Sequence, residues 1–452
     1  MSRMSGSASA ARDPGLEGRR DGSAARCYSA GTMKHEEPIA PPDRSAPVTR
    51  LAGGTAGWRR TLALMVAVQA VMSLALTVSA PFLPLYIIEL GVRPEVQVDL
   101  WAGATASVNF LFAALFSPFW GGVADRVGRK AMVVRSSVAI CAFTMLMGFA
   151  PSVGWLFAAR ACMGVFSGFS ASATALVGTQ VPEESLGFSL GWMATGQLVG
   201  GLCGPLLGGL LADHLHNYRY VFFWTSGGAL IAALICTFLV REQFAPLAGD
   251  NRRPEPIWRQ FGTLARDPRL TPMFLVVLLA QVTAMGVQPI VPLFVRSLAG
   301  DVSWLGLAAG AAFAVTGVAD VIASPLLGKR SDRIGYRRVL LISLAGAACF
   351  TIPQGFVSTI GAFLALRFGV GIFLGGILPT ANALIGRMFP ARERGQVYGI
   401  VSSATFLGMF AGPLLGGTIA ARFGYPAVFL VFGLLALCNL AWVASKVRDV
   451  SG

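Results

Sequence analysis

Residues 117–130 read SPFWGGVADRVGRK, and residues 324–337 read SPLLGKRSDRIGYR, which is the same pattern 207 positions later. Each copy places a group of charges between two long apolar runs. Three further pairs recur in the same order at offsets of 207 or 208: Arg160-x3-Gly164-x3-Gly168 with Arg367-x3-Gly371-x3-Gly375, PFLPLY (81–86) with PIVPLF (289–294), and GLCGPLLGG (201–209) with MFAGPLLGG (409–417). Ordered matches of this kind indicate that the chain consists of two related halves.

The composition places the chain in a membrane. Of its 452 residues, 54% are hydrophobic and only 13% are charged, whereas a water-soluble domain of this size needs more charge to cover its surface. A helix needs about 20 apolar residues to span a bilayer, and backbone groups in lipid must be bonded internally. Twelve such runs lie near 61–87, 100–122, 132–150, 154–177, 188–212, 219–240, 272–295, 303–327, 338–357, 359–384, 396–420 and 425–445.

These runs predict an all-α integral membrane protein with twelve transmembrane helices, arranged as two six-helix bundles. Because six is even, both bundles insert with the same orientation, as a parallel repeat. The predicted organisation is a disordered cytoplasmic tail, an N-terminal six-helix bundle, a cytoplasmic central loop, a C-terminal six-helix bundle and a short tail, over residues 1–60, 61–240, 241–271, 272–446 and 447–452. The first segment lacks the apolar core and cleavage pattern of a signal peptide.

The basic residues predict the orientation in the membrane. If the N-terminus is cytoplasmic, the inner segments hold 30 of the 36 Lys and Arg residues. This bias predicts a protein of the plasma (inner) membrane with both termini in the cytoplasm. The net charge of +14 is therefore a topology signal, and we expect a lipid bilayer and no nucleic acid as partner.

Nothing in the sequence indicates covalent chemistry. A P-loop with Gly-Lys-Ser/Thr is absent from the sequence, so ATP is not the expected direct energy source. The seven cysteines form no CxxC or metal-ligand spacing. His214 and His216 are expected at the outer end of the fifth helix, away from any metal site. We expect a monomer that is not an enzyme and that holds no metal or cofactor.

Two motifs carry a resemblance to the major facilitator superfamily over about 390 residues. The loop signature G-x3-D-R-x-G-R-R/K is matched by Gly121, Asp125, Arg126, Gly128, Arg129 and Lys130. The helix-5 signature G-x3-G-P-x2-G-G is matched by Gly200, Gly204, Pro205, Gly208 and Gly209. With Arg160 in the fourth helix, the chain resembles the twelve-helix drug:proton antiporters and looks closest to the MdtG-type multidrug efflux proteins. The resemblance implies a secondary transporter that exports small lipophilic or amphipathic compounds in exchange for protons by alternating access.

The charged loop has two interpretations. It can simply anchor the topology, or it can act as a gate, because a carboxylate there can accept hydrogen bonds from a helix N-terminus and pair with an arginine. Gly121 and Gly128 are predicted to mark tight turns. The resemblance implies the gate, with Asp125 as its breakable latch.

The second copy of the loop keeps Asp332 and Arg333 as gate candidates. Tyr336 stands where the first copy has Arg129. We therefore predict a weaker latch in the second copy.

Glycines recur every fourth residue along the fifth helix, from Gly196 to Gly208. Such a smooth face allows another helix to approach closely, and Pro205 bends the helix because it removes a backbone hydrogen bond. Ordinary tight packing and a seal against leak between moving halves both fit this pattern.

Two charged residues inside predicted spans are candidates for proton coupling. Asp320 is the only acidic residue deep in a span, and a carboxyl group away from water can take up or release a proton near neutral pH. Its alternative role is a structural hydrogen bond to Thr316. The resemblance favours coupling for Arg160, whose alternatives are snorkelling to the outer interface and a structural role shared with Arg367.

The substrate cavity is expected between the halves. Its candidate residues are Gln69, Ser73, Asn109, Ser167, Gln281, Met285, Gln288 and Asn382. An apolar cavity with a few polar groups and a flexible methionine suits varied lipophilic compounds, although each of these residues also fits plain helix packing.

Two other functions compete with drug export. A proton-coupled symporter that imports a sugar or other metabolite would favour a more polar cavity and would carry no helix-5 signature. A membrane scaffold or receptor would need neither Asp125 nor Asp320.

Overall fold

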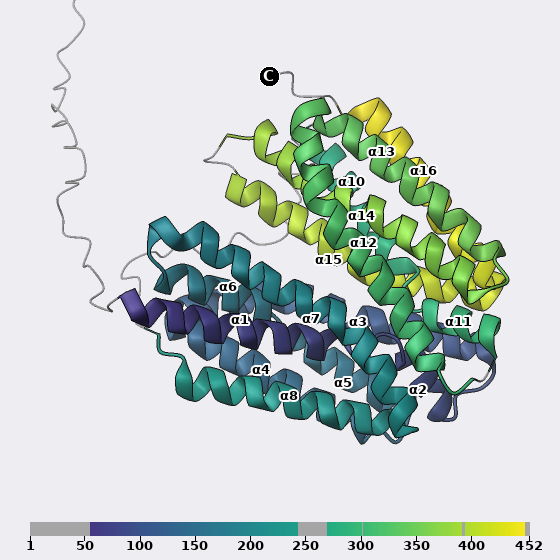
Figure 1. The fold of residues 1–452 in the computed structure, drawn as a ribbon, viewed down its shortest axis with the longest axis horizontal. Coiled ribbons are helices and arrows are strands. Elements are labelled where there is room, and N and C mark those ends of the chain that lie inside the picture. The colour runs from purple at the N-terminus through teal and green to yellow at the C-terminus, as the bar shows by residue number, and fades with distance from the viewer. Residues whose placement is uncertain (1–54, 243–268, 301, 391–393, 448–452) are drawn as a thin grey trace, which may run out of the picture. The chain divides into compact units, whose positions relative to one another are not determined.

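The computed structural model describes residues 55–242, 269–300, 302–390 and 394–447, and this part of the chain is built from helices (Figure 1). The N-terminal half contains α1 (Thr55–Thr77), α2 (Leu83–Glu89), α3 (Glu95–Val127), α4 (Arg129–Gly148), α5 (Val153–Val165), α6 (Phe169–Gln180), α7 (Leu186–Leu215) and α8 (Tyr218–Leu239). The C-terminal half contains α10 (Leu270–Gly286), α11 (Val291–Ala299), α12 (Leu305–Ile334), α13 (Tyr336–Thr351), α14 (Ile360–Met388), α15 (Arg394–Phe423) and α16 (Tyr425–Lys446). Twelve stretches within the described residues are long and apolar enough to cross a membrane, which confirms the predicted spans. Residues 1–54 of the expected tail, most of the central loop and residues 448–452 lie outside the described residues. Residues 55–60, which we expected in the disordered tail, form the start of α1.

Three predicted spans are split into two helices. The first is divided between α1 and α2, where Pro81 and Pro84 lie close together, and the seventh is divided between α10 and α11 by Pro289 and Pro292. Proline removes a backbone donor and disfavours helical geometry in the residue before it, so two prolines in four residues end the helix. The break between α5 and α6 ends at Gly168, which has φ of +104°.

Most residues of the first charged motif lie in helices and not in a loop. Helix α3 continues through Gly121 to Val127, and only Gly128, with φ of +99°, separates it from α4. The expected tight turn at Gly121 is therefore wrong, since that glycine is helical and faces open space. Gly335, with φ of +97°, makes the same turn between α12 and α13. A left-handed φ strongly favours glycine at both positions.

The glycine face of α7 packs against α1 in the N-terminal half. A Cβ at Gly196 would lie 2.7 Å from the carbonyl oxygen of Val66, and a Cβ at Gly200 would overlap the backbone of Ala70. In the C-terminal half, a Cβ at Gly412 would lie 2.8 Å from the carbonyl oxygen of Val282 on α10. Backbone therefore contacts backbone in both pairs, as small-residue faces allow.

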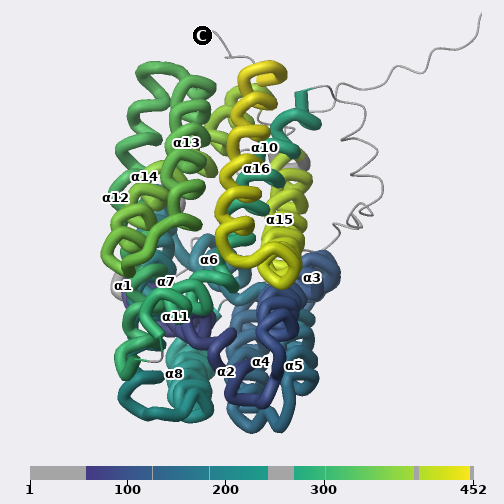
Figure 2. The backbone as a smooth tube through the Cα atoms, turned by 90° about the vertical axis from the view of Figure 1, so that its right-hand side faces the viewer, coloured from purple at the N-terminus to yellow at the C-terminus, as the bar shows by residue number. Residues whose placement is uncertain are grey.

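The two halves meet at the end of the molecule opposite to Thr55 and Lys446, which we call the distal end (Figures 1 and 2). There α7 packs on α12, and α3 packs on α15. Gly209 of α7 is in backbone contact with Gly306 of α12, and Gly417 of α15 is in backbone contact with Gly103 of α3. We call these two contacts the distal seam.

Asp213 ties the α7–α12 contact of the seam together. Its carboxylate accepts hydrogen bonds of 2.7 Å from the backbone N–H groups of both Gly306 and Leu307. Because these amides belong to the first turn of α12, the carboxylate also lies at the positive end of that helix dipole. A side chain of the N-terminal half thus caps a helix of the C-terminal half.

Candidate functional site

Two cavities lie on the inner faces of the helices. The first, with a volume of about 230 Å³, belongs to the C-terminal half and is called the C-cavity. The second, of about 860 Å³, is called the N-cavity. Its wall includes Gly121, Gly122 and Arg129 of the first motif copy together with Phe406 and Met409 of α15. The N-cavity therefore touches both halves and reaches the end of the molecule that carries Thr55 and Lys446.

The C-cavity holds Asp320 together with three of the expected cavity residues. Gln281, Met285 and Gln288 line it from α10 and from the turn after that helix. The side chain of Asp320 on α12 is exposed, although we expected it to be buried. It is not held by Thr316, because the Thr316 hydroxyl donates to the carbonyl of Ala312 at 2.9 Å. Asp320 is therefore a carboxyl group that faces an open cavity.

The arginines at equivalent positions in the two halves have different environments. Arg160 donates to the hydroxyl of Ser79 at 3.1 Å, in the break between α1 and α2. Arg367 is buried, donates through Nε to the carbonyl of Ala312 at 3.4 Å, and leaves Nη2 without a hydrogen-bond partner. Arg367 lines the C-cavity together with Asp320. Asp320 and Arg367 are thus the two ionisable residues that line this cavity, and Arg160 does not line it.

The N-cavity contains an arginine that the sequence argument missed. Arg135, in the second turn of α4, stacks 3.6 Å from the centre of the Trp120 ring and donates to the Ser167 carbonyl at 2.9 Å. Its Nε and Nη1 groups are buried and have no hydrogen-bond partner. By sequence, Arg135 is one of the 30 Lys and Arg residues of the inner segments, which predicts only a topology role. Its place inside an apolar run could have indicated a functional site, because an arginine in a membrane span is energetically costly and commonly marks a function.

The other expected cavity residues divide into two groups. Asn109 and Ser167 line the N-cavity. Gln69 donates to Ser170 at 3.0 Å, and Ser73 donates to the carbonyl of Gln197 at 2.7 Å, so these two side chains join helices within the N-terminal half. Asn382 is exposed on α14, and it lines neither cavity.

The first copy of the charged motif is held by an acidic residue from outside the motif. Glu242, just after α8, accepts hydrogen bonds of 2.9 Å from the backbone N–H groups of Arg129 and Lys130. The Lys130 ammonium group donates to the carbonyl of Thr237 at 2.8 Å. The start of α4 is therefore capped from α8, while the side chain of Asp125 lies outside the described part of the chain.

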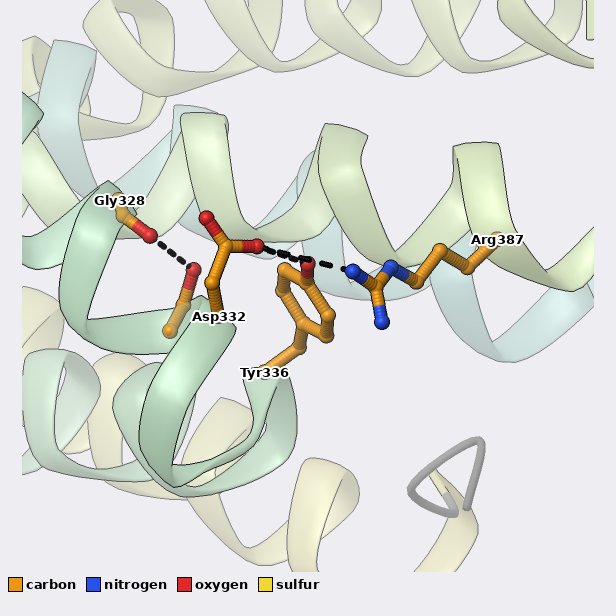
Figure 3. A network of polar contacts seen from close by, with 5 residues as sticks. Gly328, Asp332, Tyr336 and Arg387 are labelled. Carbon is orange, nitrogen blue, oxygen red and sulfur yellow. Dashed lines mark hydrogen bonds and ion pairs between the residues drawn. The ribbon is translucent and has the colours of Figure 1, made fainter. Parts of the chain in front are cut away.

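The second copy forms an exposed network (Figure 3). The Tyr336 hydroxyl donates to the Asp332 carboxylate, and Arg387 of α14 lies 3.8 Å from the same carboxylate. The Arg387 guanidinium also stacks 4.9 Å from the centre of the Tyr336 ring. Asp332 and Arg387 are 61% and 56% exposed, and ion pairs this exposed contribute about 0–1 kcal/mol.

Comparisons with known proteins give a consistent result. The model of the Major Facilitator Superfamily matches residues 65–318 and 273–451. The chain is 37% identical over 392 residues to the multidrug resistance protein MdtG of Salmonella typhimurium, covering 86% of this chain and 96% of that protein. It is 36% identical over 374 residues to MdtG of Klebsiella pneumoniae, covering 83% and 90%.

Solved structures show the same fold at low sequence identity. A bacterial homologue of the human lysosomal transporter Spinster, in an inward-facing unoccupied conformation, has a TM-score of 0.71 at 16% identity and covers 86% of this chain and 97% of its own. The nucleoside transporter NupG (D323A mutant) has a TM-score of 0.71 at 12% identity and covers 85% and 100%.

Proposed function

Because the chain belongs to the Major Facilitator Superfamily, we propose that it is a multidrug exporter that moves small amphipathic compounds out of the cell in exchange for protons. Export of drugs across the inner membrane by a multi-pass carrier is the part that its MdtG relatives support. Exchange for protons and alternating access are argued from the site.

The observation that carries the proposal is the pair of charged side chains in the C-cavity. Asp320 is an ionisable group inside a membrane span, and Arg367 lies in the same cavity with an unused donor. Ionisable residues inside a membrane protein are costly and mark pathways for protons or substrates. A proton on Asp320 changes the charge of the cavity by one unit. Proton binding and substrate binding at this cavity therefore influence each other reciprocally.

The arrangement of the halves fits one state of an alternating-access cycle. The basic residues favour a cytoplasmic location for the end of the molecule that carries Thr55 and Lys446. The N-cavity reaches that end, and the distal seam closes the other. In this state a compound can enter from the cytoplasm. Export then requires the distal seam to open and the cytoplasmic end to close.

The N-cavity has the size and lining expected for a drug site. Its volume of about 860 Å³ falls within the usual range for pockets that bind small molecules, roughly 300–1,000 Å³. The walls contain Phe110, Phe169 and Trp120, together with Met163 and Met409. Aromatic rings and flexible methionines adapt to ligands of different shape.

Arg135 is expected to select compounds with a negative charge. Replacing it by glutamine should weaken binding of 8-anilinonaphthalene-1-sulfonate about tenfold or more, because a charge-assisted hydrogen bond contributes about 1.5–3 kcal/mol. Binding of N-phenyl-1-naphthylamine, which has the same rings without the sulfonate, should change little. Fluorescence titration of the purified protein measures both dissociation constants.

Arg135→Lys is the matched control for this substitution, since it keeps the charge but loses the planar donor geometry. We expect it to bind the sulfonate with intermediate affinity. If both probes bound equally more weakly, Arg135 would shape the cavity without distinguishing charged from neutral compounds.

The first copy of the charged motif should control the rate of the cycle. Asp125→Asn is expected to lower turnover several-fold and to leave substrate affinity nearly unchanged, because a latch between conformations acts on their interconversion. Asp332→Asn is the paired control, and we expect a smaller effect from it because Asp332 lies in an exposed network. Initial export rates over a range of substrate concentrations separate the effect on turnover from the effect on substrate affinity. A larger effect at Asp332 than at Asp125 would contradict the latch.

Proton exchange itself is tested in everted membrane vesicles energised by respiration. A panel of lipophilic cations, anions and neutral drugs is added while the internal acidity is followed with a pH-sensitive dye. Loss of acidity on addition of a compound, absent from vesicles without the protein, supports drug:proton exchange. A response only to a sugar or a metabolite, added from the periplasmic side, would replace the proposal by a symporter.

A further inference from the structure

The distal seam contains two carboxyl groups that are held in opposite ways. Asp213 accepts two backbone hydrogen bonds at the start of α12, which is a favourable site for a negative charge. Asp99, in the second turn of α3, is only 4% exposed, and its Oδ1 atom is buried without a hydrogen-bond partner. One of the two carboxyl groups is therefore satisfied as an anion, and the other is not.

Asp99 lies where the two halves touch. Its backbone carbonyl contacts Gly417 of α15, and Tyr425 of α16 is an electrostatic neighbour of its side chain. Both of these residues belong to the C-terminal half. Separation of α3 from α15 and α16 would consequently take Asp99 out of its buried position.

A small cavity of about 270 Å³ adjoins this contact. Four charged or titratable groups line it: Glu95 from α3, Arg93 from the loop before α3, Arg296 from α11 and Tyr425 from α16. Glu95 lies one turn before Asp99 on the same helix, and like charges at this spacing repel each other. Charged or titratable groups of both halves therefore line one cavity at this contact.

The closed seam therefore favours neutral Asp99. Burying a carboxylate is unfavourable unless donors compensate it, and the buried Oδ1 atom of Asp99 has no hydrogen-bond partner. Once the halves separate at the distal end, water reaches the carboxyl group and stabilises its charged form. Closure of the seam then requires a proton, and opening releases one.

We propose that Asp99 is a proton-binding site of the distal seam, which closes on the protonated carboxyl group and opens on the carboxylate. The inference rests on the proposed function in one respect, namely that the halves separate at the distal end during transport. In the proposed orientation this site takes its proton from outside the cell. External acid then favours the closed seam, and Asp99 is separate from Asp320, which faces the C-cavity.

Two spin labels across the seam measure its opening. They are attached at Gly154→Cys, in the first turn of α5, and at Ser358→Cys, before α14, since both positions are exposed at the distal ends of opposite halves. The native cysteines are replaced by alanine in a background that still transports, and distances are recorded by pulsed electron paramagnetic resonance in lipid nanodiscs between pH 5 and 9. The ratio of open to closed populations should rise with pH, by up to about tenfold per pH unit for one linked proton.

The variants distinguish a proton site from a structural contact. Asp99→Asn should remain mostly closed, with populations that no longer depend on pH, and Asp99→Glu should restore the dependence. Asp213→Asn is the matched control, because it weakens a contact of the same seam whose carboxylate is satisfied as an anion. We expect it to raise the open population at every pH and to retain the slope with pH.

An unchanged pH dependence in Asp99→Asn would overturn the proposal. A seam that stays closed at every pH in the protein with native Asp99, while Asp213→Asn opens it, would overturn it as well. Failure of the proposed function looks different, because the everted vesicles would then show no drug:proton exchange although the spin labels still reported pH-dependent opening.

Discussion

Asp320→Asn is expected to abolish proton-coupled export and to leave the protein folded in the membrane. Asparagine has nearly the shape of aspartate but cannot take up a proton. The charge of the C-cavity can therefore no longer change by protonation at this position. Asp320 is exposed and makes no hydrogen bond to Thr316, which predicts little loss of stability. In reconstituted liposomes with an imposed proton gradient, the rate of drug transport by the variant should not exceed the background rate.

Substrate exchange without a gradient provides the control for this prediction. Asp320→Asn should still exchange labelled for unlabelled drug across the liposome membrane, because binding and the movement of the halves do not require a change of protonation at Asp320. Loss of both exchange and gradient-driven transport would indicate a binding or folding defect. Normal gradient-driven transport in Asp320→Asn would place the proton site elsewhere.

Gly209→Ala is expected to prevent the distal seam from closing. The added methyl group would overlap the backbone carbonyl of Gly306 in the opposite half, and backbone cannot rotate away as a side chain can. Overpacking of this kind costs about 1–3 kcal/mol, which shifts a two-state equilibrium by roughly 5–150-fold. The two halves can relieve the overlap by separating, so we expect a larger open population and a severe loss of transport.

Gly201→Ala is the matched control on the same helix. Its methyl group would meet only the Ser73 hydroxyl at 3.6 Å, which is an ordinary contact, so transport should be nearly normal. The spin labels at positions 154 and 358 report the open population for both variants. Equal behaviour of the two variants would show that the α7–α12 contact does not control closure.

The twelve spans, the duplication and the glycine face were predictable from the sequence because each depends on local information. The length of an apolar run decides whether a helix can cross the membrane. An offset of 207 or 208 residues shows directly that two segments are related. A glycine at every fourth position marks one face of a helix before its partner is known.

Other features depend on contacts between residues that are far apart in the sequence. Arg160 and Arg367 occupy equivalent positions, yet one contacts Ser79 and the other lines a cavity with Asp320. Repeats in the sequence could not separate these roles, because the neighbours of each arginine come from other helices. Arg135 was counted as a topology charge for the same reason.

The sequence by itself determined the membrane fold, its two-fold repeat and the two motifs that show the family. Only the tertiary structure decided that Asp213 caps a helix of the opposite half and that Asp99 lies buried against Gly417 and Tyr425. Hydrophobicity places a residue inside or outside the bilayer. Whether a buried charge is compensated depends on donors and acceptors that packing brings from distant parts of the chain.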